Sequence, residues 1–87
     1  MAEVKIYSSA LCGFCWRAKG LLEKKGIKYN EVDVTMDAAK KQEMTQLTGG
    51  RTSVPQIFID GEHVGGCDDL FNLDGSGRLD QMLGVHG

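Results

Sequence analysis

Proline and cysteine are scarce in this chain of 87 residues, which contains one proline, one tryptophan and three cysteines. Three thiols are too few, and odd in number, for a scaffold held together by disulfides. We therefore expect reactive thiols in a reducing compartment, with the cytoplasm as the location. The first residues lead directly into a strand pattern, and no basic segment with an apolar core precedes it, so no secretory signal is expected.

Long apolar runs and a strong net charge are also missing. No apolar stretch approaches the roughly 20 residues that a helix needs to cross a bilayer. The net charge of −2 at pH 7 gives no electrostatic reason to bind nucleic acid or an anionic membrane, so we predict neither as a partner. The length fits a single small domain, residues 1–87, with a core of modest size.

Strand and helix patterns alternate along the chain. The Asp60-Gly61 pair is typical of a type I′ turn, which makes the last two strands antiparallel, whereas the opening strand–helix–strand unit predicts a parallel pair. The order β-α-β-α-β-β-α predicts an α/β fold with a four-stranded mixed sheet and helices on both faces. Strands are expected over residues 4–8, 27–34, 54–60 and 62–64. The first helix is expected over 13–25, and the second is expected to begin at a cap on Thr35 or Asp37 and to end at Gly49-Gly50. The last helix is expected over 68–83, with a break at 74–77. Phe14, Ala18, Leu21 and Leu22 form the predicted apolar stripe of the first helix.

The most informative motif is CGFC, Cys12 to Cys15, between the first strand and the first helix. Two cysteines three positions apart, with no second such pair, favour a redox pair over half a zinc site. Unpaired N–H groups and the helix dipole at a helix start favour the thiolate, which is the nucleophile in disulfide exchange. We interpret Cys12 as the nucleophile and Cys15, one turn deeper, as the thiol that resolves a mixed disulfide with Cys12. Two buried structural cysteines are the less favoured interpretation.

Pro55 and the segment from Gly65 to Asp69 are two further candidates for functional positions. Pro55 starts an apolar strand pattern, where an ordinary trans proline is the simplest interpretation from the residues alone. Gly65 to Asp69 reads as a strand end, a tight turn and a helix start, where backbone amides can hold a carboxylate and Asp68 can pair with an ammonium group. Alternatively, Asp68 and Asp69 only cap the helix.

Three segments together resemble the glutaredoxin family: CGFC after VKIYSS, the block SVPQIFIDGEHVGG, and the CDDL that follows it. The similarity spans nearly the whole chain and is closest to the short bacterial dithiol glutaredoxins of the thioredoxin superfamily. This resemblance implies a thioredoxin fold and glutathione-dependent reduction of protein disulfides and glutathionylated proteins. Glutathione would then be the co-substrate of a monomeric enzyme.

The resemblance also implies roles for individual residues. Cys12 and Cys15 would be catalytic, and Pro55 would be cis and face them. The backbone of Val54 would pair with the substrate as a short added strand. Lys41, and less strongly Arg51, would bind the glycine carboxylate of glutathione. The complete set of implied glutathione-binding residues is Phe14, Lys41, Val54, Pro55, Gly66, Cys67 and Asp68, with Asp69 nearby.

The chain departs from the family pattern at two places. Many dithiol glutaredoxins have proline and tyrosine at the positions of Gly13 and Phe14, and a lysine at the position of Ser9, so one cation near the site is missing. The monothiol branch reads CGFS, and the shared CGF keeps open an alternative function. In that alternative, a dimer holds a [2Fe–2S] cluster between two Cys12 thiolates and two glutathiones. Cys15, in place of serine, favours redox chemistry.

Other interpretations are weaker. A thioredoxin-like reductase served by a flavoprotein is disfavoured by the GGCDD segment at residues 65–69. Residues 72–83 imitate a calcium loop, but the last position is Leu83 and no second loop follows, so we predict a helix break and no metal. His63 and the cysteines are zinc-ligand types at spacings far too wide for a finger. The tail around His86 is predicted to be disordered.

Overall fold

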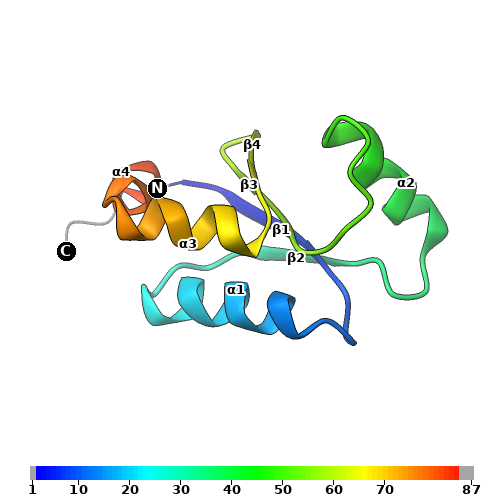
Figure 1. Ribbon diagram of the computed structural model, residues 1–87, viewed down its shortest axis with the longest axis horizontal. Helices are drawn as coiled ribbons and strands as arrows, with labels where there is room; N and C mark the ends of the chain where they lie inside the picture. Colours follow the sequence, from blue (N-terminus) through cyan, green and yellow to red (C-terminus); the bar gives the residue numbers. More distant parts are fainter. Residues whose placement is uncertain (1, 85–87) are drawn as a thin grey trace.

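The computed structural model describes residues 2–84, so the prediction for His86 lies outside the described part of the chain. Strands and helices follow one another in the predicted order, with the last helix divided in two (Figure 1). The elements are β1 (Val4–Ser8), α1 (Gly13–Lys24), β2 (Asn30–Asp33), α2 (Ala38–Leu47), β3 (Gln56–Ile59), β4 (Glu62–Gly65), α3 (Cys67–Gly75) and α4 (Arg78–Leu83).

The sheet is mixed, as predicted, with the strand order β2-β1-β3-β4. β1 pairs in parallel with β2 and antiparallel with β3, and β3 pairs antiparallel with β4. Asp60 and Gly61 have φ angles of 53° and 81°, the left-handed pair that a type I′ turn requires, so this turn prediction is confirmed. The central position of β1 brings the end of this strand, and the CGFC motif that follows it, to the middle of the sheet edge.

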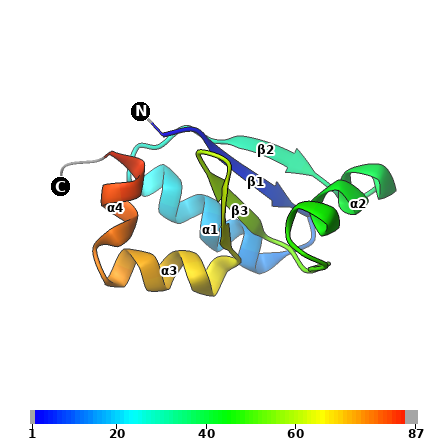
Figure 2. The same cartoon turned by 90° about the horizontal axis from the view of Figure 1, so that it is seen from above.

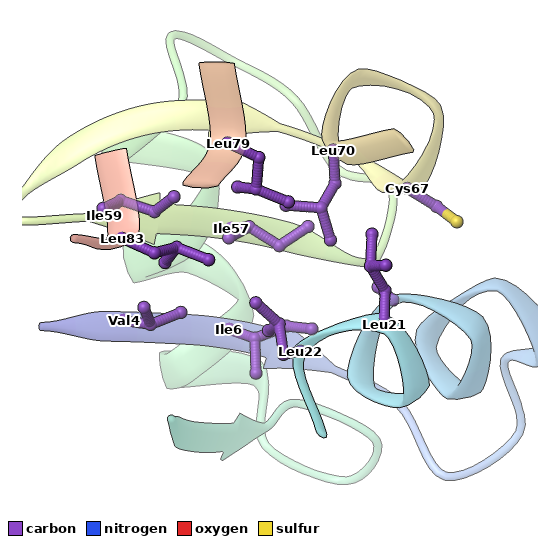
Figure 3. Close-up of a cluster of buried hydrophobic side chains, with 11 residues drawn as sticks. Val4, Ile6, Leu21, Leu22, Ile57, Ile59, Cys67, Leu70, Leu79 and Leu83 are labelled. Atoms are coloured by element: carbon purple, nitrogen blue, oxygen red, sulfur yellow. The ribbon is translucent and has the colours of Figure 1, made fainter. Parts of the chain in front are cut away.

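Helices cover both faces of the sheet. Because side chains alternate along a strand, Ile6 and Ile57 face one side while Tyr7 and Phe58 face the other. The first side packs against α1, α3 and α4, and Figure 2 shows α1 and α3 next to each other beneath the strands. The second side packs against Met44 of α2. The larger core cluster, drawn in Figure 3, consists of Val4, Ile6, Ala18, Leu21, Leu22, Ile57, Ile59, Cys67, Leu70, Leu79 and Leu83.

Several predicted bounds were wrong. The second strand is shorter than 27–34 because the backbone N–H of Ile27 still bonds to the carbonyl of Leu22, which closes α1. The third strand is Gln56–Ile59 rather than 54–60, and the last helical region begins at Cys67 rather than Asp68. Its break lies within the predicted residues 74–77, at Ser76 and Gly77, whose φ is 79°.

The predicted stripe of α1 was also wrong at Phe14. This side chain is 55% exposed, whereas Cys15, Ala18 and Leu22 are fully buried. Residues spaced by three and four positions share a helix face, so the face that begins at Cys15 turns Phe14 by about 100° away from the sheet. Phe14 is thereby left free to line the candidate site.

None of the helices within residues 2–84 combines the length and the apolar character that crossing a bilayer requires.

Candidate active site

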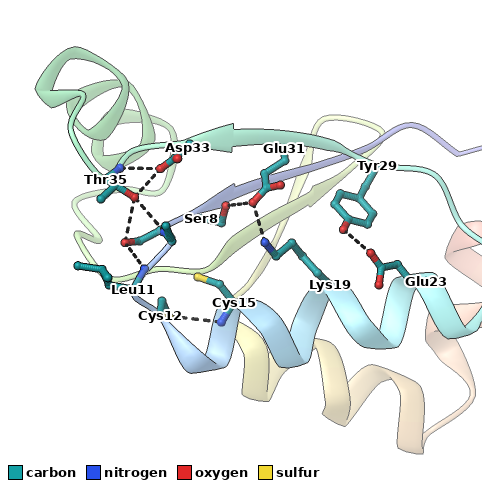
Figure 4. A network of polar contacts seen from close by, with 12 residues as sticks. Ser8, Leu11, Cys12, Cys15, Lys19, Glu23, Tyr29, Glu31, Asp33 and Thr35 are labelled. Carbon is teal, nitrogen blue, oxygen red and sulfur yellow. Dashed lines mark hydrogen bonds and ion pairs between the residues drawn. The ribbon is translucent and has the colours of Figure 1, made fainter.

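The two cysteines of the CGFC motif lie at the start of α1. Cys12 is the N-cap, and its sulfur accepts a hydrogen bond of 3.3 Å from the backbone N–H of Cys15 (Figure 4). Cys12 is half-buried, while Cys15 is fully buried beneath the sheet, and both are free thiols. The predicted arrangement, an accessible first sulfur with its partner one turn deeper, is therefore present in the fold. That Cys12 is the nucleophile stays a prediction.

Burial determines the protonation of the second thiol. Desolvation, together with the neighbouring sulfur of Cys12, raises the pKa of Cys15 to about 12. The positive charge of Lys19, one turn further along α1, acts in the opposite direction. At neutral pH the Cys15 side chain is consequently a thiol and not a thiolate.

The peptide bond between Val54 and Pro55 is cis, which confirms what the resemblance implied for this proline. The loop before β3 brings this bond against the CGFC motif, where the Cys12 sulfur lies 3.6 Å from the carbonyl oxygen of Val54. A Cβ atom at Gly66 would come within 3.3 Å of the Pro55 carbonyl, so a glycine allows the start of α3 to approach this loop closely.

At the start of α3, the two adjacent acidic residues have different environments. A carboxylate oxygen of Asp69 accepts the backbone N–H of Gly66 at 2.9 Å, which is a helix-capping bond. Asp68 is exposed, with its carboxylate at the same end of the helix. The interpretation of both residues as caps is therefore correct for Asp69. Cys67 directly precedes these two aspartates and follows the Gly65-Gly66 turn. Its thiol is buried, and burial raises its pKa.

These segments enclose a cavity of about 340 Å³ beside the CGFC motif. Every residue of the implied glutathione set lines it except Lys41, which is exposed on α2. Arg51 is the cation in the lining, and its guanidinium lies 3.8 Å from the Asp69 carboxylate. Ser53 lines the cavity without having been predicted, and its position directly before Val54 was the available signal. The lining consists of Phe14, Arg51, Ser53, Val54, Pro55, Gly66, Cys67, Asp68 and Asp69.

The segment that imitates a calcium loop supplies two carboxylates that pair with a lysine. The ammonium group of Lys25 lies 2.7 Å from Asp74 and 2.6 Å from Asp80, so these two carboxylates join the end of α1 to α3 and α4. Residues 2–84 contain no cluster of three or more His, Cys, Asp or Glu side chains arranged to hold a metal ion.

Comparisons with known proteins agree with this geometry. A sequence model of the family described as glutaredoxin matches residues 4–64. Glutaredoxin 3 of Escherichia coli (strain K12) is 52% identical over 83 residues, which cover 95% of this chain and 99% of that protein.

Solved structures of glutaredoxins also superpose well on this fold. The solution structure of glutaredoxin from Brucella melitensis matches with a TM-score of 0.83 at 46% identity, covering 95% of this chain and 89% of that one. A buckwheat glutaredoxin crystallised as a glutathione complex matches with a TM-score of 0.87 at 31% identity, covering 95% and 77% of the two chains. The four-stranded mixed sheet with its flanking helices is thus the thioredoxin fold, and this chain is a thiol–disulfide oxidoreductase that belongs to the glutaredoxin family.

Proposed function

We propose that this protein uses glutathione to reduce protein disulfides and glutathione mixed disulfides through Cys12 and Cys15. We also propose that it acts in the cytoplasm as a monomer whose single domain spans residues 1–87. The observation that carries the proposal is the cavity beside Cys12, whose lining offers both charge types that glutathione needs.

The chemistry of the lining supports glutathione as the ligand. The amides at the start of α3, at Gly66 and Cys67, suit the carboxylate of the γ-glutamyl end, and Asp68 suits its ammonium group. The backbone of Val54 suits an extended peptide laid along it, with Phe14 and Pro55 as apolar walls. Arg51 offers a cation for the glycine carboxylate, a role that the resemblance implies for Lys41.

Reduction of a glutathione mixed disulfide needs one enzyme thiol. The Cys12 thiolate attacks the glutathione sulfur, the bond to the protein sulfur breaks, and the protein thiolate leaves and takes up a proton. Cys12 now carries glutathione in a disulfide. A second glutathione thiolate attacks the bound glutathione sulfur, which forms glutathione disulfide and returns Cys12 as a thiolate.

Reduction of a protein disulfide needs both enzyme thiols. Cys12 first forms a mixed disulfide with one substrate sulfur, and Cys15 then attacks Cys12 and releases the reduced substrate. The Cys12–Cys15 disulfide is reduced by two molecules of glutathione, which leave as glutathione disulfide.

A coupled assay tests the proposal. The protein is incubated with a glutathionylated peptide, glutathione, glutathione reductase and a reduced nicotinamide, and nicotinamide oxidation is followed. We expect turnover that saturates with glutathione and stops when glutathione is omitted. Turnover with thioredoxin reductase in the absence of glutathione would contradict the proposal and favour a thioredoxin-like reductase.

The same preparation distinguishes the cluster alternative. After anaerobic reconstitution with iron, sulfide and glutathione, we expect a colourless monomer. A brown dimer with visible absorption would instead support a [2Fe–2S] cluster held by two Cys12 thiolates with two glutathiones.

A further inference from the structure

Lys19 is a largely buried cation on the same helix face as the buried thiol. It follows Cys15 by four positions, which places both side chains on one face of α1. Its side chain is only 12% exposed. Figure 4 shows the Cys15 sulfur and the Lys19 side chain both directed from α1 toward the strands, below Ser8 and Glu31.

Two neighbours contact the Lys19 ammonium group in this position. It lies 2.8 Å from a carboxylate oxygen of Glu31 on β2 and 4.5 Å from the centre of the Trp16 ring. The same Glu31 oxygen accepts the hydroxyl of Ser8 on β1. Lys19 and Ser8 together lower the pKa of Glu31, so this carboxylate stays charged and continues to hold the ammonium group.

Attack by Cys15 on the mixed disulfide is electrostatically unfavourable, and the positive charge of Lys19 reduces this cost. Cys15 is fully buried, and burial disfavours its charged form. Negative charge nevertheless develops on its sulfur when it attacks a disulfide on Cys12. A fixed positive charge nearby lowers the free energy of that transition state more than the free energy of the uncharged thiol before reaction.

We propose that Lys19 is a positioning residue for the resolving step, in which its ammonium group stabilises the charge that develops on Cys15. This inference rests on the proposed function in taking Cys15 as the resolving thiol. In the step, a bond forms between the sulfurs of Cys15 and Cys12, and the bond from Cys12 to the substrate sulfur breaks. The substrate thiolate leaves, and the proton lost by Cys15 is balanced by the proton that this thiolate gains.

An aromatic disulfide separates this step from the first attack. When dithiobis(nitrobenzoate) is mixed with the reduced protein in a Cys67→Ser background, attack by Cys12 releases one coloured thiolate at a rate that depends on reagent concentration. Attack by Cys15 on the mixed disulfide at Cys12 then releases the second coloured thiolate, at a rate that does not depend on reagent concentration. The Cys15→Ser variant identifies the second phase, because it should lack it.

Lys19→Met should slow the second phase about tenfold and leave the first phase within about twofold of the unmodified rate. Lys19→Arg keeps the charge and should restore the second phase to within about threefold. Lys24→Met removes an exposed lysine from the same helix and should change neither phase. Should Lys19→Met fail to fold, Lys19→Gln is measured in its place.

A second phase unaffected by Lys19→Met would overturn the proposal. Equal slowing of both phases would also overturn it, and so would a Lys19→Arg variant whose second phase is as slow as that of Lys19→Met. Each of these results would indicate that Lys19 has only a structural role. The reagent contains no glutathione, so a negative coupled assay would count against the proposed function and not against this inference.

Discussion

The sulfur of Cys12 lies 3.6 Å from the carbonyl oxygen of Val54, although 42 residues separate the two in the chain. The carbonyl belongs to the residue before a cis proline, at the point where the backbone leads into β3. A substrate that extends along Val54 would therefore present its sulfur directly to Cys12.

Replacing each active-site cysteine should separate the two reactions. We expect Cys12→Ser to abolish turnover of every disulfide substrate, because it removes the attacking sulfur. Cys15→Ser should retain much of the activity on a glutathionylated peptide, which needs one thiol, and lose activity on protein disulfides. The glutathione-coupled assay with both substrates measures this, and equal loss in both variants would contradict the assignment.

Alkylation should distinguish the three thiols by accessibility and ionisation. With limiting iodoacetamide at neutral pH, we expect modification at Cys12 and almost none at Cys15 or Cys67, which are buried. Because the pKa of Cys15 is about 12, its thiolate fraction should rise about tenfold with each pH unit below that value. Peptide mapping by mass spectrometry after timed quenching gives the three rates. A Cys15 rate independent of pH, or equal to that of Cys12, would be inconsistent with this environment.

The cation that binds the glycine carboxylate can be identified by a matched pair of variants. Arg51→Met should raise the KM for glutathione about three- to tenfold, the effect of roughly 1 kcal/mol expected for a solvent-exposed ion pair. Lys41→Met removes the same charge, yet should change KM less than about twofold, because Lys41 is outside the cavity lining of the described residues. The opposite ranking would assign the carboxylate to Lys41, as the resemblance implies.

Two glycine substitutions should change stability in opposite directions. Gly65 has a φ of 124°, and a Cβ there would overlap the Asp69 carboxylate that caps α3. Gly65→Ala should therefore lower the free energy of unfolding by about 2–3 kcal/mol.

Gly20 is exposed within α1, and a Cβ there meets no atom within 4 Å. Gly20→Ala should raise the free energy of unfolding by up to about 1 kcal/mol. Urea denaturation of both variants measures these changes, and destabilisation by Gly20→Ala would contradict the comparison.

Local sequence patterns predicted most of the fold correctly. The spacing of apolar residues identified the order of strands and helices, and Asp60-Gly61 identified its turn, since both depend on short-range geometry. The errors were local as well. Phe14 was placed in the core because its apolar character was read without the exact phase of α1, which only packing against the sheet defines.

The candidate site was less accessible to prediction from residues alone. Cys12 and Cys15 stood out because their spacing carries their chemistry. The resemblance favoured Lys41 over Arg51 as the cation, whereas the path of the loop before β3 puts Arg51 in the cavity lining. Glu31 carries no motif, so nothing in the sequence connected it with Lys19.

The sequence by itself determined the spacing of the two cysteines in the CGFC motif, the order of the elements and the family to which this chain belongs. Those properties reside in neighbouring residues, whose spacing and chemistry act over a few positions. Only the tertiary structure decided that Val54 meets Cys12 and that Lys19 meets Glu31 beside Cys15. Such contacts depend on how the helices and strands pack together, and burial in that packing raises the pKa of Cys15 and of Cys67.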